Sequence, residues 1–197
     1  MYFTINTFGC KVNQYDGEVL KRLMTEAGFQ EATLPELADI FILNSCTVTE
    51  NGDKKALHEA ERIRRQNPAA VIVLTGCYPQ AFPDKAAEIT AADIITGTAD
   101  RTKIPEKIKA FLDEKSRIIA LGANPACYEE TAVPTETDKT RAFVKIEDGC
   151  NRFCTYCIIP YARGRVRSRS LDDIKEEAKT LIKKGFREIV LTGINLS

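Results

Sequence analysis

Short apolar runs alternate with longer amphipathic stretches along the first 115 residues. The apolar runs are Tyr2–Thr7, Asp39–Leu43, Ala70–Leu74 and Asp93–Ile95. The stretches that follow them have the apolar spacing of helices and cover Asp16–Ala27, Glu50–Gln66, Pro83–Ile89 and Ile104–Glu114. Nearly continuous apolar strands that alternate with helices are typical of a parallel sheet covered on both faces. The predicted fold class is therefore α/β, with a doubly wound N-terminal domain over residues 1–115.

A different organisation follows in the rest of the chain. Residues 116–140 contain the stretch GANPACYEETAVPTETDKT, whose Pro, Thr, Glu and Ala content is typical of a linker. The later pattern predicts a strand at Ala142–Ile146, a helix from an N-cap at Ser170 to Lys184, and a strand at Glu188–Leu191. Two strands and one helix cannot bury their apolar faces alone. We therefore expect residues 141–197 to be the first βαβ unit of an incomplete TIM-type barrel, in a piece of a longer protein.

Composition narrows the class of protein further. The chain has 197 residues, 44% of them apolar, which excludes a disordered or fibrous protein. No apolar run is long enough to span a bilayer and the N-terminus does not resemble a signal peptide, so we expect a cytoplasmic protein without a membrane partner. In that reducing compartment, seven cysteines favour metal binding or catalysis over a set of disulfides.

The charge is unevenly distributed along the chain. Residues 1–140 carry 16 basic and 21 acidic side chains, whereas residues 141–197 carry 12 basic and 7 acidic ones. Arg163, Arg165, Arg167 and Arg169 alternate along a segment that we expect to be extended, where they would share one face. Such a face could bind phosphates or another anionic group, and a solvated charged edge is the alternative. The helix at Glu50–Gln66 carries both signs of charge, so we interpret it as a solvent-facing helix.

The most specific pattern is the cysteine triplet Cys150, Cys154 and Cys157, within GCNRFCTYCIIPYARGRVRSR. Three thiolates at this spacing can take three corners of a 4Fe–4S cluster and leave the fourth iron open to a small molecule. A redox dithiol formed by Cys154 and Cys157 is an alternative, but it would leave Cys150 without a role. A zinc site is another alternative, although His58 and Cys127 are too isolated to complete it.

Three further cysteines are far apart in the sequence, but each has the same position relative to a predicted strand. Cys10, Cys46 and Cys77 each lie just beyond a predicted strand, within TFGC, LNSC and LTGC. All carboxyl ends of a parallel sheet open on one edge, which is where open α/β folds bind ligands. Three buried cysteines that act as small apolar residues are the alternative.

The segment CNRFCTYC resembles the signature of radical S-adenosylmethionine (SAM) enzymes. Together with TFGCKVNQYD, LNSCTVT, LTGCYPQ and GCNRFCTYCIIPYARGRVRSR, it resembles the successive motifs of the radical SAM methylthiotransferases. Within that family, GCKVNQYD, NSCTVT-x2-GDKK and YARGRVRSR resemble the branch that acts on N6-threonylcarbamoyladenosine in tRNA. The resemblance spans nearly the whole chain.

The resemblance implies two 4Fe–4S clusters and SAM as cofactors. Cys150, Cys154 and Cys157 would hold the cluster that binds SAM and starts the radical chemistry. An auxiliary cluster that carries the transferred sulfur would be held by Cys10, Cys46 and Cys77. Tyr156 would pack near the SAM adenine, Asn195 would lie near its amino end, and the arginine segment could contact RNA or the SAM carboxylate.

The implied reaction adds a methylthio group to C2 of the modified adenine at position 37 of tRNA. The partners would be the tRNA anticodon stem-loop, whose unstacked bases can enter a site, and an electron donor such as flavodoxin or ferredoxin. Alternatives are the same chemistry on isopentenyladenosine or on a ribosomal-protein aspartate, and a non-catalytic RNA-binding module stabilised by a metal. These 197 residues alone are not expected to be fully active.

Overall fold

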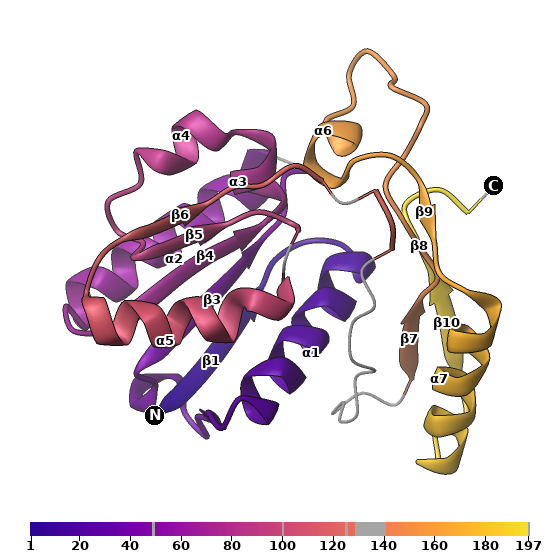
Figure 1. The fold of residues 1–197 in the computed structure, drawn as a ribbon, viewed down its shortest axis with the longest axis horizontal. Helices are drawn as coiled ribbons and strands as arrows, with labels where there is room; N and C mark the ends of the chain where they lie inside the picture. The colour runs from indigo at the N-terminus through magenta and orange to yellow at the C-terminus, as the bar shows by residue number, and fades with distance from the viewer. Residues whose placement is uncertain (49, 100, 125, 129–140, 197) are drawn as a thin grey trace.

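The computed structural model describes residues 1–48, 50–99, 101–124, 126–128 and 141–196. They form a six-stranded α/β domain and, beside it, a smaller part that begins at residue 141 (Figure 1). None of the helices in these ranges is long and apolar enough to cross a membrane.

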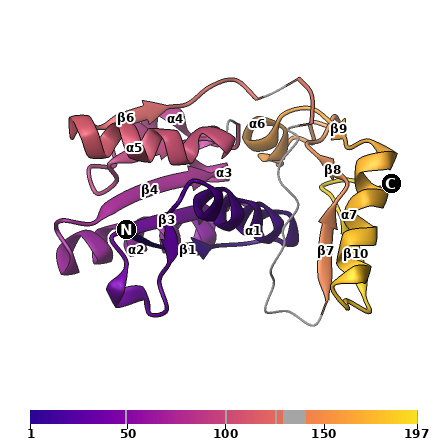
Figure 2. The same ribbon diagram turned by 60° about the horizontal axis from the view of Figure 1, so that its bottom comes forward.

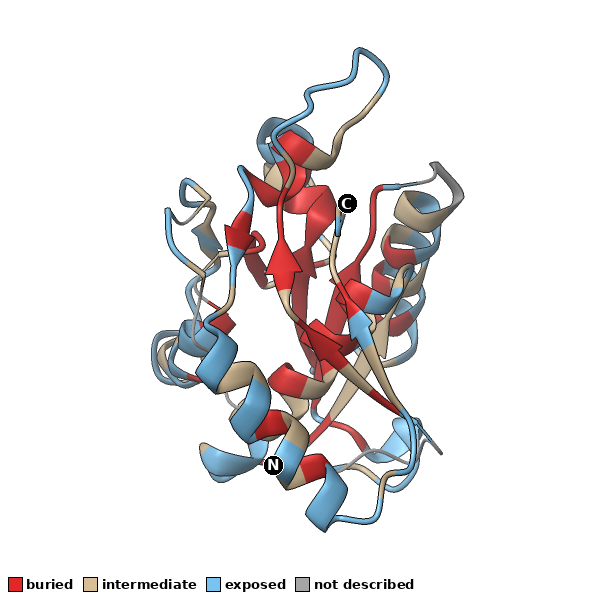
Figure 3. Ribbon diagram, turned by 90° about the vertical axis from the view of Figure 1, so that its right-hand side faces the viewer, coloured by how far each residue is buried: buried red, intermediate tan, exposed pale blue. Residues whose placement is uncertain are grey.

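The large sheet is entirely parallel and has the strand order β2-β1-β3-β4-β5-β6. Its strands are β1 (Tyr2–Thr7), β2 (Gln30–Glu31), β3 (Ile40–Ser45), β4 (Val71–Gly76), β5 (Ile94–Thr96) and β6 (Ile118–Ala120). Every residue of β3 and β4 is buried, because helices cover both of their faces. Figure 3 shows that the buried residues are concentrated in the strands.

Two helix layers enclose this sheet and confirm the doubly wound α/β fold. One face is covered by α1 (Lys11–Glu26) and α5 (Ile104–Glu114), and the other by α2 (Glu50–Gln66), α3 (Cys77–Ala81) and α4 (Pro83–Ala87). On the first face, Leu20 and Met24 of α1 pack with Ile40 and Ile42 of β3. Short 3-10 helices at Pro35–Leu37 and Arg101–Lys103 complete the connections.

The start of α1 and the position of β6 differ from the prediction. Helix α1 begins at Lys11 instead of Asp16, with Cys10 in extended backbone at its N-cap, and Asp16 lies buried within the helix. Strand β6 pairs with β5 and places residues 118–120 in the sheet, inside the segment predicted as a linker. Much of that segment, residues 129–140, lies outside the described residues.

The smaller part contains the predicted βαβ unit. Its parallel strands β7 (Ala142–Lys145) and β10 (Ile189–Thr192) are joined through α7 (Leu171–Lys183). Ser170 is the N-cap of α7, as predicted, and its hydroxyl accepts a hydrogen bond from the backbone N–H of Asp173 at 3.1 Å. Between β7 and α7 the chain also forms β8 (Glu147–Asp148), α6 (Ile159–Arg163) and β9 (Arg167–Ser168), which the apolar pattern did not predict.

The two parts pack directly against each other at the carboxyl edge of the large sheet. Helix α1 contacts β7, and α3 contacts α6 (Figures 1 and 2). The Thr98 hydroxyl donates a hydrogen bond of 2.8 Å to the carbonyl oxygen of Ala162. Asn124 Nδ2 donates one of 3.1 Å to the carbonyl oxygen of Tyr161. Helix α6 is therefore fixed over the edge where the N-terminal cysteines lie.

Candidate functional site

Cys10, Cys46 and Cys77 lie at the carboxyl edge of the large sheet, each after a strand. Cys10 follows β1 as the N-cap of α1, Cys46 follows β3, and Cys77 begins α3 after β4. Strands β1 and β3 are neighbours, but the chain leaves them in opposite directions along the sheet. Such a switch point is the usual ligand-binding crevice of an open α/β sheet.

The three thiols influence one another. A hydrogen bond with Cys46 lowers the pKa of Cys10 to about 5 against the effect of burial, and the Arg163 guanidinium contributes to the lowering. The same hydrogen bond, together with burial, raises the pKa of Cys46. Burial raises the pKa of Cys77, which the Arg163 guanidinium partly offsets. Cys10 is therefore the thiolate of the hydrogen-bonded pair, and the thiolate is the form of cysteine that binds metals.

Two glycines allow these loops to approach each other closely. A Cβ atom at Gly9 would lie 2.2 Å from Cys46 Sγ, and one at Gly76 would lie 2.4 Å from the carbonyl oxygen of Ser45. Their φ angles of +96° and +100° are also in the region that favours glycine. Only glycine fits at either position without displacing the cysteine loops.

A buried ion network of Asp16, Arg101, Lys145, Asp148 and Arg163 adjoins the thiols. Arg163 Nη1 lies 3.0 Å from Asp16 Oδ2 and 3.1 Å from each carboxylate oxygen of Asp148. Lys145 Nζ lies 2.5 Å from Asp16 Oδ1 and 3.1 Å from Asp148 Oδ2. Arg101 Nη2 lies 3.0 Å from Asp16 Oδ2. The network thus joins residues of both parts of the chain.

This network is almost completely buried. Its three cations and two carboxylates are each at most 4% exposed, and Arg167 adds a further cation 3.9 Å from Asp148. Burial raises the pKa of the neighbouring Glu147. A buried guanidinium such as that of Arg163 is stabilised by nearby anions. The thiolate of Cys10, on which Arg163 acts, is such an anion.

A second buried polar contact connects α1 with α7. The Tyr15 hydroxyl donates to the carboxylate of Glu177, with 3.2 Å to each oxygen. Arg169 forms an ion pair with the same carboxylate, and its Nη1 also donates to the Tyr15 hydroxyl oxygen at 3.3 Å. The contact fixes the orientation of α7 against the N-terminal domain.

The cysteine triplet lies in the loop between β8 and α6. Cys150 and Cys157 are partly exposed, and Cys154 is exposed. The loop is held by hydrogen bonds from the Cys150 N–H to the carbonyl oxygen of Gly164 at 3.0 Å and from the Cys157 N–H to that of Cys154 at 2.9 Å. The triplet is therefore accessible from solvent, in contrast to the buried Cys46 and Cys77.

The N-terminal cysteines suit the donor chemistry of an iron–sulfur cluster. Within the ranges that the structure describes, no three His, Cys, Asp or Glu side chains are grouped as ligands of one metal ion. In a 4Fe–4S cluster each cysteine binds a different iron, so the ligands lie farther apart than around one zinc ion. At the N-terminal set, the thiolate of Cys10 and the nearby guanidinium of Arg163 suit an anionic thiolate–cluster unit.

The two residues expected near SAM are Tyr156, in the loop between β8 and α6, and Asn195, in the turn after β10. Tyr156 is 90% exposed, within the triplet loop. The backbone N–H groups of Ile194 and Asn195 donate to Glu147 Oε2 at 2.7 and 2.9 Å. These contacts fix the turn after β10 beside β8, and a role of Tyr156 or Asn195 in SAM binding stays a prediction.

The prediction that four arginines share one extended face is wrong. Arg163 ends helix α6 and is 1% exposed, and Arg167 is buried with its Nη1 donating to the carbonyl oxygen of Arg163 at 2.8 Å. Arg169 is occupied by Glu177. Only Arg165 among the four is exposed, and its guanidinium lies 5.2 Å from the centre of the Phe153 ring. Because Arg163 is the last residue of helix α6, the segment is not extended throughout and its side chains do not share one face. Ion pairs with buried carboxylates also hold Arg163 and Arg169 inside the protein.

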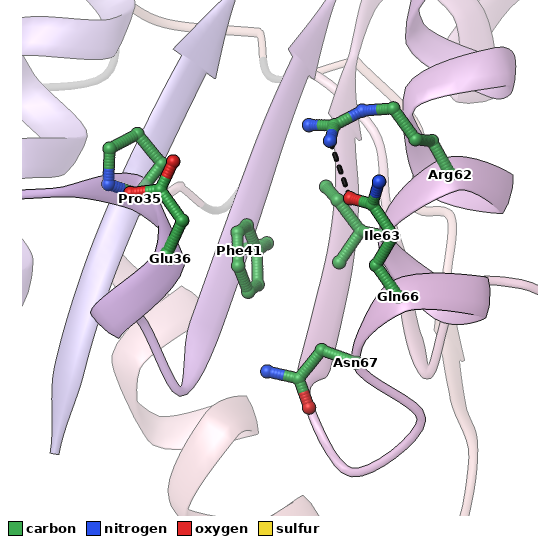
Figure 4. Close-up of a pocket in the computed structure, with 7 residues that line it drawn as sticks. All are labelled: Pro35, Glu36, Phe41, Arg62, Ile63, Gln66 and Asn67. Carbon is green, nitrogen blue, oxygen red and sulfur yellow. Dashed lines mark hydrogen bonds between the residues drawn. The ribbon is translucent and has the colours of Figure 1, made fainter.

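Other residues considered in the sequence lie away from both cysteine sets or on the surface. His58 and Cys127 are exposed, as their isolated positions suggested. A cleft of about 490 Å³ lies near the amino end of β3 and the C-terminal end of α2, at the opposite edge of the sheet from the thiols (Figure 4). Its lining residues are Pro35, Glu36, Phe41, Arg62, Ile63, Gln66 and Asn67.

Sequence reasoning missed the polar residues that join the two parts. Asn13, Tyr15, Asp16, Lys145 and Asp148 are all buried, yet none was selected from the sequence. Asn13, Tyr15 and Asp16 lie within the quoted motif GCKVNQYD, immediately after Cys10. Their position directly after Cys10, at the end of a predicted strand, was the signal in the sequence that could have identified them.

Comparison with known proteins agrees with this division of the chain. Residues 2–97 match the Uncharacterized protein family UPF0004, and residues 144–195 match the Radical SAM superfamily. A Bacillus subtilis protein named threonylcarbamoyladenosine tRNA methylthiotransferase MtaB is 44% identical over 96% of the chain and 43% of its own length. A Thermotoga maritima protein of the same name is 40% identical over 98% of the chain and 44% of its own length.

Relatives with another printed name are similar over the same region. A Clostridium novyi protein named tRNA-2-methylthio-N(6)-dimethylallyladenosine synthase is 37% identical over 99% of the chain and 44% of its own length. The chain thus spans less than half the length of these relatives.

The matches place a UPF0004 region before a region that matches the Radical SAM superfamily. The chain is similar over almost its whole length to threonylcarbamoyladenosine tRNA methylthiotransferases, and this confirms the resemblance found in its motifs. Membership of the Radical SAM superfamily implies one 4Fe–4S cluster and SAM.

Proposed function

We propose that the chain acts in the transfer of a methylthio group to C2 of N6-threonylcarbamoyladenosine at position 37 of tRNA. The observation that carries the proposal is the pair of three-cysteine sets on two domains that pack against each other, one set at a sheet switch point and one in a loop. The names of the Bacillus subtilis and Thermotoga maritima relatives support the choice of base. The location would be cytoplasmic.

Each cysteine set would hold one 4Fe–4S cluster. Cys150, Cys154 and Cys157 would bind the cluster that meets SAM, and Cys10, Cys46 and Cys77 would bind an auxiliary cluster. When bound, the clusters and SAM would supply the radical chemistry and the sulfur needed to replace a hydrogen on an unactivated aromatic carbon.

The residues of the chain itself would position these groups and exclude water. The buried ion network holds α6 and β7 against α1, so the triplet loop and the N-terminal thiols keep a fixed relation. The close packing of α6 on α3 shields Cys77, which is 1% exposed. Arg165 stays a candidate for RNA contact, because it is exposed beside the loop and partners an aromatic ring.

Metal analysis tests the two-cluster proposal directly. After anaerobic reconstitution with iron and sulfide, the chain is expected to bind about eight irons, since each three-cysteine set holds four. The Cys10→Ala/Cys46→Ala/Cys77→Ala variant should keep about four, and so should the Cys150→Ala/Cys154→Ala/Cys157→Ala variant. A total of about four irons in the unmodified chain would show that only one cluster forms, which would contradict the proposed auxiliary cluster. Zinc in place of iron would favour a metal-stabilised RNA-binding module.

An activity assay tests the substrate. The full-length protein, with SAM and reduced flavodoxin or ferredoxin, is expected to form the 2-methylthio product on tRNA that carries N6-threonylcarbamoyladenosine. The names of the dimethylallyladenosine synthase relatives support isopentenyladenosine as a second candidate base, so tRNA carrying that base is the matched comparison. Product on that tRNA alone, or only on a ribosomal protein, would contradict the proposed substrate. The chain as it stands is expected to show less than full activity, because its relatives are more than twice as long.

A further inference from the structure

Arg163 belongs to the radical SAM part of the chain, where it pairs with Asp148, and it is also bonded to the N-terminal domain. Its side chain is 1% exposed. Nη1 donates to Asp16 Oδ2 at 3.0 Å, and Nη2 donates to Asn13 Oδ1 at 3.1 Å. The guanidinium also interacts with the Cys77 thiol and acts electrostatically on Cys10. One side chain thus reaches the N-terminal cysteines from the neighbouring domain.

Asn13 extends this contact to the other two cysteine loops. Its Nδ2 donates to the carbonyl oxygen of Phe8 at 2.7 Å, two residues before Cys10. It also donates to the carbonyl oxygens of Asn44 and Ser45 at 3.0 and 3.1 Å, directly before Cys46. The position of the Arg163 guanidinium is therefore fixed relative to both loops.

The hydrogen bonds of Arg163 are incomplete on the protein side. Its Nε is buried and has no hydrogen-bond partner among the described residues. This buried donor without a partner, on a guanidinium beside three thiols, points to an anionic group at the thiols.

We propose that Arg163 is a positioning residue of the N-terminal cysteine site, where it holds the cysteine loops and places a positive charge that favours reduction of the bound cluster. The inference rests on the proposed function, because it needs a cluster on Cys10, Cys46 and Cys77. Reduction adds one negative charge, and a fixed cation in a water-excluded site stabilises that charge. The potential of an iron–sulfur cluster depends on such charges and hydrogen bonds. Arg163 thereby makes the redox state of the N-terminal site depend on docking of the radical SAM part.

The test measures the midpoint potential of the N-terminal cluster in isolation. The Cys150→Ala/Cys154→Ala/Cys157→Ala background removes the other cluster from the chain, and an anaerobic redox titration is followed by electron paramagnetic resonance. In that background, Arg163→Gln is expected to lower the equilibrium constant for reduction about tenfold, which is 59 mV for a one-electron couple. Arg165→Gln is the matched control, since Arg165 is exposed and two residues away, and it should change the constant less than about twofold.

A variant of opposite sign separates electrostatics from structural damage. Asp16→Asn removes a negative charge with almost no change of shape, so it should raise the equilibrium constant for reduction. Opposite shifts in the two variants support the proposal, whereas no shift, or shifts in one direction, overturn it. If the Arg163→Gln variant binds no iron, the test rests on the Asp16→Asn variant alone. An unchanged or lowered equilibrium constant for reduction in that variant overturns the proposal. Absence of any cluster in the unmutated background would instead refute the proposed function, and the inference with it.

Discussion

Asp16 and Lys145 are 129 residues apart in the sequence, yet Lys145 Nζ lies 2.5 Å from Asp16 Oδ1. Asp16 lies on α1 of the N-terminal domain, Lys145 ends β7 of the smaller part, and both side chains are buried. The two parts therefore meet through a buried ion network as well as through apolar packing. The N-terminal cysteine site thus includes Arg163 from the other part of the chain.

Lys145→Ala tests this connection between the two parts. The substitution should lower the free energy of unfolding by about 3 kcal/mol, because it leaves buried carboxylates with fewer cations. It also removes the Lys145 ammonium from the Tyr128 ring, whose centre is 5.4 Å away. The measurement is urea denaturation followed by circular dichroism.

Lys21→Ala is the control for that experiment. Lys21 Nζ lies 2.7 Å from Glu31 Oε2, but this pair is much more exposed than the pair of Lys145 and Asp16. A surface ion pair contributes about 0–1 kcal/mol, so the effect should be small. Equal losses of stability in the two variants would show that burial of the network has no special importance.

The glycine before Cys77 gives a second prediction. Gly76→Ala should destabilise the chain at least about 2 kcal/mol more than Gly28→Ala, because strain and a collision add at this position. Both glycines have similar φ angles, +100° and +92°, but a Cβ at Gly28 would meet nothing within 4 Å. At Gly76 it would lie 2.4 Å from backbone of Ser45. The comparison of urea midpoints measures what the collision and the ψ angle of −154° at Gly76 add to a positive φ, and similar midpoints would contradict the close approach.

The contact of Tyr15, Arg169 and Glu177 predicts a pH-dependent effect. Burial already raises the pKa of Glu177, and Arg169→Ala removes the cation that stabilises its charged form. The folded variant would then bind a proton that the unfolded chain releases above its ordinary pKa of about 4.3, so stability falls as pH rises through that window. The loss caused by Arg169→Ala should therefore be larger at pH 8 than at pH 5, as measured by urea unfolding at both values.

Tyr15→Phe is the partner experiment for this contact. It removes the hydroxyl that donates to Glu177 but leaves the Arg169 ion pair in place. A loss of about 1.5–3 kcal/mol is expected for a hydrogen bond to a charged group. Because Arg169 still favours the charged form of the carboxylate, the loss should vary less with pH than that of Arg169→Ala. The same pH dependence in both variants would exclude Glu177 as its source.

The sequence predicts the parts of the fold that follow from apolar periodicity. The fully buried β3 and β4 read as continuous apolar runs, and a strand at the core of a parallel sheet requires such runs. The equivalent positions of Cys10, Cys46 and Cys77 follow in turn, because parallel strands end on the same edge. The pattern therefore suffices to bring these three cysteines to one place.

The charged residues at the interface could not be placed in the same way. Arg163 looks like a surface residue in a basic segment, and its partner Asp16 is 147 residues away in the sequence. No local pattern distinguishes a buried ion pair of this kind from a solvated charge. Short elements such as α6 and β9 were missed for a related reason, since their few residues show no period and tertiary contacts fix them.

The reactivity of Cys10 gives the last prediction. In the cluster-free chain, alkylation of Cys10 by iodoacetamide should be almost independent of pH above about pH 6, because its pKa is lowered to about 5 and the thiolate is the reacting form. The rate at each pH can be followed by mass spectrometry of the peptide. Cys46→Ala removes the hydrogen bond that is the largest cause of the lowering, so the inflection should move toward the ordinary thiol pKa of about 8.5. Cys77→Ala keeps that hydrogen bond and should leave the inflection low. An inflection near 8.5 in the unmodified chain would show that Cys46 does not stabilise a thiolate at the switch point.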